Sequence, residues 1–221
     1  MDRNLSKPET ESQVRRSSVA PHAVVLRAAL RGFTKIAVKL EPPRILPMLD
    51  ECVDFISTIA RQNGGEIYGA DAEWVTVGFG LRIAKKNGNA EAAVRAAQQL
   101  LEGFELICAR WRETADSPFA LSIGIHEGEV LAASLGSGSQ LSPTLVGDTV
   151  NVAVRLAQRA RAGEAILSAS IRKAFQDLPG VEIKPLGGMS FDARSQRLDI
   201  YCIPRAERMD LGELRREITR H

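Results

Sequence analysis

The chain has little cysteine, few aromatic residues and almost no excess charge. Its three cysteines, Cys52, Cys108 and Cys202, are odd in number and far apart, which excludes a disulfide framework and a CxxC metal site. The net charge is only +2, so the composition indicates neither a nucleic acid partner nor a membrane-binding surface. No apolar run approaches the ~20 residues that span a bilayer, which predicts a protein without a membrane span.

The first twenty residues also lack the apolar segment of a secretory signal, and with thiols in apolar stretches this predicts a cytoplasmic protein. Residues 1–20 are polar and aperiodic, so we expect a disordered N-terminal tail. Within it, Arg15-Arg16-Ser17-Ser18 is either a phosphorylation site or a solvated segment that nothing recognises. Residues 21–204 show no internal boundary and are expected to form one domain, followed at 205–221 by a charged C-terminal helix available to a protein partner.

Apolar periodicity predicts an alternation of strands and helices from residue 22 onward. The expected strands are 23–29, 66–68, 74–79, 119–126, 129–135, 165–168, 181–185 and 198–203, and the expected helices are 42–63, 89–113, 149–162 and 170–176. His126-Glu127-Gly128 is expected to form a hairpin turn, and 136–142 a Gly- and Ser-rich loop. This order predicts an α+β fold with a ferredoxin-like core, in which helices cover one face of a mixed, mainly antiparallel sheet.

The chemically most informative stretch is Leu145–Leu156, where Gly147-Asp148 precede a predicted helix. Asn151 and Arg155 are four residues apart and project from one face of that helix. A carboxamide and a guanidinium near a helix N-terminus can hold a polyphosphate, although an exposed Asn–Arg pair without function is the simpler alternative.

Three stretches together resemble the catalytic domain of class III adenylyl and guanylyl cyclases. They are Leu30–Thr34, Ser122–Val130 and Gly147–Leu156, and they occur in the order and at the spacing of that family. The resemblance covers residues 22–203, nearly all of the predicted domain. It implies the class III cyclase fold and an active site shared between two head-to-tail domains, with two aspartates of one protomer holding two metal ions and an Asn–Arg pair coming from the other.

Carried over position by position, the resemblance implies a site of which one half is kept. Asn151 and Arg155 match the transition-state pair, and Phe33 and Thr34 match substrate-binding positions after the first strand. The remaining positions depart from the family pattern. Ala29 stands at the first metal aspartate, Glu73 at the second, Gly69 at the purine-selecting lysine, and Thr144 at its companion, where some relatives also have Thr.

These departures predict a degenerate, pseudo-cyclase domain that is not an enzyme alone and acts as a dimeric regulatory or scaffolding module. Two alternatives stay open: a subunit of a composite adenylate or guanylate cyclase with another cyclase domain as partner, or a sensor that holds ATP or GTP without turnover. No cofactor is expected unless a partner supplies ligands for Mg²⁺ or Mn²⁺. Arg27 lies two residues before Ala29 on the same strand face, so its guanidinium either pairs with Glu73 in the vacated metal position or points to solvent.

Overall fold

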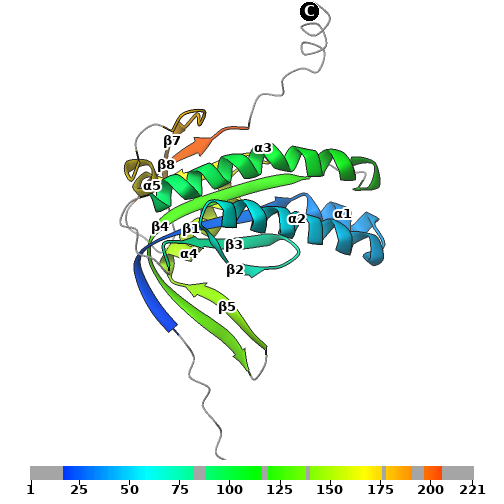
Figure 1. The fold of residues 1–221 in the computed structure, drawn as a ribbon. Helices are drawn as coiled ribbons and strands as arrows, with labels where there is room; N and C mark the ends of the chain where they lie inside the picture. Colours follow the sequence, from blue (N-terminus) through cyan, green and yellow to red (C-terminus); the bar gives the residue numbers. More distant parts are fainter. Residues whose placement is uncertain are drawn as a thin grey trace, which may run out of the picture.

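In a computed structural model, the described residues are 17–81, 88–115, 119–137, 140–175, 178–190 and 197–205. They form one mixed sheet with helices packed on it (Figure 1). The strands are β1 (Ser17–Arg31), β2 (Glu66–Ala70), β3 (Trp74–Phe79), β4 (Ala120–Ser137), β5 (Gln140–Val146), β6 (Ala165–Ser168), β7 (Lys184–Met189) and β8 (Leu198–Ile203). The helices are α1 (Phe33–Lys39), α2 (Pro42–Gln62), α3 (Asn89–Ala115), α4 (Asp148–Arg159) and α5 (Ala169–Lys173).

The strand order in this sheet is β2-β3-β1-β4-β6-β8-β7, and β5 pairs with the far end of β4. The pairing of β4 with β6 is parallel and the other strand pairings in the sheet are antiparallel. This arrangement confirms the predicted α+β class with a mixed, mainly antiparallel sheet. None of the described helices combines the length and apolar character that crossing a membrane requires.

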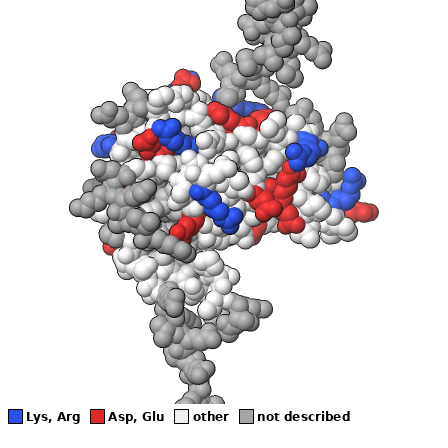
Figure 2. Space-filling model, in the orientation of Figure 1, with Lys and Arg blue, Asp and Glu red and all other residues white. Residues whose placement is uncertain are grey.

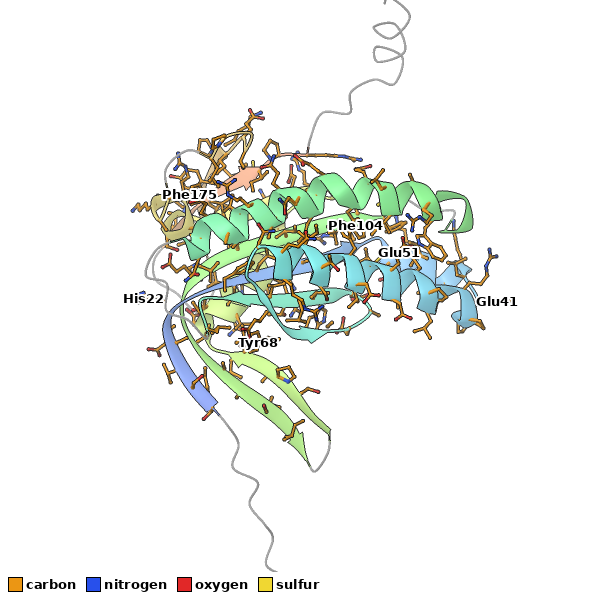
Figure 3. All side chains as sticks on the ribbon, viewed as in Figure 1. His22, Glu41, Glu51, Tyr68, Phe104 and Phe175 are labelled. Atoms are coloured by element: carbon orange, nitrogen blue, oxygen red, sulfur yellow. The ribbon has the colours of Figure 1, made fainter. Side chains whose placement is uncertain are left out.

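The main core lies between the sheet and the helices α2 and α3, which run side by side over one of its faces (Figure 1). Phe104 of α3 contacts the rings of both Phe55 and Phe119, and Glu51 of α2 accepts a hydrogen bond from Trp111 Nε1 of α3 at 2.6 Å (Figure 3). The apolar residues that define the periodicity of both helices are therefore the ones that pack in the core.

Helix α4 covers the opposite face of the sheet, so the expectation that helices cover one face only is wrong. Its apolar residues Val152 and Leu156 pack on Ile166 of β6. Gly124 of β4 lies directly beneath it, and a Cβ there would stand 2.1 Å from the Ala153 carbonyl oxygen and 2.3 Å from the Ala157 nitrogen. The absence of a side chain at Gly124 is what lets α4 approach the sheet this closely.

The predicted hairpin at His126-Glu127-Gly128 is wrong, because β4 runs through these residues without a turn. Strand β1 pairs with β4 on both sides of the segment, and Gly128 leaves room for Thr149, whose hydroxyl donates to the Glu129 carbonyl at 2.7 Å. His126 is buried within the strand, and its Nδ1 is 2.8 Å from Ser168 Oγ. The predicted loop at 136–142 is also mostly strand, since the register of β4 with β5 extends to Ser137 and Gln140.

The folded part begins before the predicted boundary at residue 21. Residues 17–20 are not tail but the first part of β1, because they pair with Leu131–Ala133 and Val130 of β4, and Ala20 is buried there. The start of β1, the end of β4 and β5 together project away from the body of the domain (Figure 1), and this projection is called the arm below. The expected tail at 1–16 and most of the expected helix at 205–221 lie outside the described residues.

Candidate functional site: a pocket between strand β1 and helix α4

A pocket of about 280 Å³ opens between the end of β1, the start of α1, the β2–β3 turn and helix α4. Its lining combines polar and apolar groups from these elements: Arg27, Ala29, Leu30, Arg31, Gly32, Thr34, Glu73, Trp74, Val154, Ala157 and Gln158. Arg27 and Ala29 share the α4 side of β1 because side chains alternate along a strand. Four of the predicted site residues, Arg27, Ala29, Thr34 and Glu73, thus line the same pocket.

The guanidinium of Arg27 is held in place by two residues of β3. Thr76 is its direct cross-strand neighbour, and Arg27 Nη1 donates to Thr76 Oγ1 at 2.6 Å. The guanidinium carbon also lies 3.5 Å from the centroid of the Trp74 ring, a cation–π contact. Burial lowers the pKa of Arg27 to about 10, against the opposing effect of Asp71, so the side chain keeps its charge at neutral pH.

Neither alternative for Arg27 is found, because its guanidinium does not pair with Glu73 and contacts β3 instead of pointing to solvent. The exposed Glu73 carboxylate accepts a hydrogen bond from Thr34 Oγ1 at 3.2 Å. Asp71 Oδ1 accepts the backbone N–H groups of Glu73 at 2.8 Å and Trp74 at 3.1 Å, which closes the turn before β3. Arg27 takes the Thr76 hydroxyl, directly opposite it on β3, as its hydrogen-bond acceptor in place of the Glu73 carboxylate.

Gly69 lies in an irregular part of β2, where its φ of +142° favours glycine. A Cβ at this position would stand 3.2 Å from Trp74 Cζ3. Gly69, which the resemblance aligns with the family's purine-selecting lysine, leaves room for the indole ring on which Arg27 stacks. Gly69, Trp74 and Arg27 form one structural unit.

Arg31 is a site residue that the sequence analysis missed. Its Nη2 donates to the carbonyls of Ala157 and Ala160 at 3.0 Å each and also to that of Gln158, while Nε donates to Ser122 Oγ at 3.0 Å. These contacts fasten the C-terminal end of α4, where carbonyl groups lack helical partners and a cation is favourable. No local pattern signals this role, because the partners are about 90 to 130 positions away in the chain.

The remaining predicted site residues do not line the pocket. Asn151 is exposed on α4, and Arg155 on the same helix is half-buried and makes contacts of its own. Thr144 is paired with Ala133 on the arm. The Phe33 side chain is buried in the main core, so it supports α1 and does not face a substrate. The pocket meets α4 at Val154, Ala157 and Gln158, one to two turns beyond Asn151.

The pocket residues do not fit a pair of divalent metal ions. Mg²⁺ and Mn²⁺ take oxygen ligands, with carboxylates foremost. Glu73 is the single carboxylate among the lining residues, where two guanidinium groups, of Arg27 and Arg31, also lie. In the part of the chain that the structure describes, no group of three His, Cys, Asp or Glu side chains could hold a metal ion.

The chain belongs to the adenylate and guanylate cyclase catalytic domain family, whose model matches residues 17–204. It is similar to Adenylate cyclase 1 of Rhizobium meliloti, with 31% identity over 171 residues that cover 76% of this chain and 25% of that protein. Adenylate cyclase 2 of the same organism is 25% identical over 192 residues, 85% of this chain and 51% of that protein. The chain therefore spans between a quarter and a half of the length of these curated relatives.

Solved structures share the fold. The adenylyl cyclase CyaB from P. aeruginosa superposes with a TM-score of 0.78 at 24% identity, covering 87% of this chain and 98% of that one. The guanylate cyclase domain of RhGC from Catenaria anguillulae gives a TM-score of 0.72 at 21% identity, covering 86% and 100%. The class III cyclase fold predicted from the sequence is confirmed.

Proposed function

We propose that this chain is a cyclase-family signalling domain that does not make cyclic nucleotides alone and acts as a dimeric regulatory or scaffolding module. The observation that supports the proposal is the lining of the pocket, in which Glu73 is the single carboxylate beside Ala29 and Arg27. The degenerate domain would work in the cytoplasm, with residues 205–221 available to a protein partner.

The energetic consequence of this lining is large. Metal ions that activate a nucleophile and neutralise a leaving group each contribute several kcal/mol. Losing about 4 kcal/mol of transition-state stabilisation lowers a rate roughly a thousandfold, at 1.36 kcal/mol per factor of ten. In a homodimer both sites carry the same substitutions, so neither compensates for the other.

The arm supports dimerisation. Residues 131–146 contain no Lys, Arg, Asp or Glu, and this part of the surface is white below the charged body in Figure 2. Val19, Leu131 and Val146 are cross-strand neighbours on one face and are 61%, 37% and 47% exposed. Leu135 lies on the same face of β4 and is also exposed. A contiguous apolar strip of this kind is typical of a protein interface.

The proposal is tested by measuring cyclic AMP and cyclic GMP formed by the purified chain with Mg²⁺ or Mn²⁺. We expect no product above that of the Asn151→Ala, Arg155→Ala double variant, which serves as the contamination control. A triple variant, Ala29→Asp with Glu73→Asp and Arg27→Phe, introduces the two aspartates that the family pattern has at these positions. We expect this variant to bind nucleotide in a metal-dependent way. Cyclic product from the unmodified chain that the double variant lacks would refute the proposal.

The alternative of a composite cyclase is favoured by one feature, the retained Asn151 and Arg155 on α4, with Asn151 exposed. In such a pair the partner domain supplies both aspartates and this chain supplies the amide and the guanidinium. Mixing the chain with a cyclase domain that has both aspartates but lacks its own Asn–Arg pair distinguishes the two functions. Activity that appears only in the mixture, and disappears with Asn151→Ala, would establish the composite enzyme instead of the regulatory module.

A further inference from the structure

The pocket holds a positively charged group at a fixed position. Arg27 is anchored through Nη1 by Thr76 and through its π-face by Trp74, and neither contact uses its Nε or Nη2. Three of its donor hydrogens are therefore left for another acceptor. A guanidinium that is already oriented loses little side-chain entropy when an anion binds.

We propose that this pocket binds a polyphosphate group, of a nucleotide or free, without a divalent metal ion, and that the Arg27 guanidinium is its anchor. This inference rests on the proposed function, because it takes the pocket to hold no metal pair. Guanidinium groups match phosphate oxygens in a bidentate geometry, which a strongly hydrated lysine does not.

The size and the charge of the pocket agree with such a ligand. Its volume of about 280 Å³ lies just below the ~300–1,000 Å³ of sites that enclose a whole drug-sized ligand, so it suits a phosphate chain. Arg27 and Arg31 contribute two positive charges against the one negative charge of Glu73. Arg31 contacts the end of α4 through Nη2 and Ser122 of β4 through Nε, and these contacts leave out its Nη1.

Neutralising Glu73 distinguishes an anion site without metal from a metal site, because the two predict opposite changes in binding. In a metal site this carboxylate would be a ligand, and its neutralisation would weaken binding. In an anion site without metal the same carboxylate repels the phosphates, so Glu73→Gln is expected to strengthen binding about twofold to fivefold at this exposed position. Mg²⁺ likewise is expected to weaken binding, because it neutralises the phosphate charge that Arg27 attracts.

The experiment is calorimetric titration of the full chain with ATP, GTP and inorganic tripolyphosphate, each in EDTA and then in excess Mg²⁺. We expect binding in EDTA that Arg27→Gln weakens about tenfold or more, as the loss of a charged hydrogen bond predicts. Arg61→Gln is the matched control, since Arg61 is exposed on α2 and outside the pocket. Tighter binding of ATP or GTP than of tripolyphosphate would identify a nucleotide as the ligand, and equal binding would identify the phosphate chain alone.

Binding that requires Mg²⁺, or no binding in EDTA, would overturn the inference, as would an Arg27→Gln variant that behaves like Arg61→Gln. If Arg27→Gln does not fold, Glu73→Gln tests the same point with a predicted change of the opposite sign. The two proposals fail separately. Metal-dependent cyclic product refutes the proposed function, whereas an inactive chain without metal-free binding refutes only this inference.

Discussion

At the scale of single residues, Arg27 depends on direct contacts with Thr76 and Trp74 of β3. The alternation of side chains along β1 was enough to predict that Arg27 shares a face with Ala29. Its partner could not be predicted, because Thr76 and Trp74 are set opposite β1 by the register of β3, which is a tertiary property. The one sequence signal was a threonine within the apolar run of β3, on the face that meets α4.

Gly124 is the residue at which we expect the largest loss of stability. Gly124→Val would place Cβ against the backbone of α4, at 2.1 Å from the Ala153 oxygen, and should lower the free energy of unfolding by more than about 3 kcal/mol. Gly180→Ala is a suitable control, since no atom lies within 4 Å of its Cβ position and only its φ of +81° opposes the change, for about 1–2 kcal/mol. Urea unfolding of both variants measures the difference; equal losses would contradict the close packing of α4.

At the scale of elements, helix α4 lines the pocket with Val154, Ala157 and Gln158 and also carries Asn151 and Arg155. Its position depends on Thr149 at one end and on Arg31 at the other. The sequence predicted this helix as 149–162, whereas α4 spans Asp148–Arg159 with Gly147 as its N-cap. It could not predict which side of the sheet α4 covers, because that depends on Gly124 and on strands far away in the chain.

We expect Arg31→Met to release the last turn of α4. The substitution keeps much of the aliphatic length but leaves the carbonyls of Ala157 and Ala160 without their cationic partner, at a cost of about 1.5–3 kcal/mol. Hydrogen exchange should accelerate at the Ala160 amide, which donates to Leu156. Arg159→Met changes an exposed arginine in the same turn and should leave this exchange unaffected. Unchanged protection in Arg31→Met would show that the helix does not need this anchor.

The longest strand gave the least accurate sequence prediction. A run of Gly and polar residues at His126–Glu129 has the composition of a turn, but pairing of His126, Glu127 and Gly128 with β1 keeps β4 extended. The actual end of β4 lies in the Gly- and Ser-rich stretch that follows, as the composition of that stretch allows. The local sequence thus predicted a turn at His126-Glu127-Gly128 and a loop at 136–142. Pairing with β1 keeps the first of these segments within strand β4.

At the scale of the whole molecule, we propose that the domain assembles through the uncharged arm. Leu135→Asp would place a charge within the exposed apolar strip and is expected to convert the dimer into a monomer in sedimentation velocity. Leu106→Asp is the matched control, because Leu106 is 72% exposed on α3, away from the arm. A wild-type chain that sediments as a monomer, or equal behaviour of the two variants, would argue against association through the arm.

The pairing of β1 with β4 also has a mechanical consequence. The two strands form a ribbon that carries Arg27 opposite Gly124 in the body of the domain and Val19 opposite Leu131 in the arm. Its register shifts between Ala20 and Ala23, where Pro21 has no N–H to add to the ladder. The ribbon is therefore expected to bend most easily at this step. A displacement of the arm would change the twist of β1 there before it changes the position of Arg27.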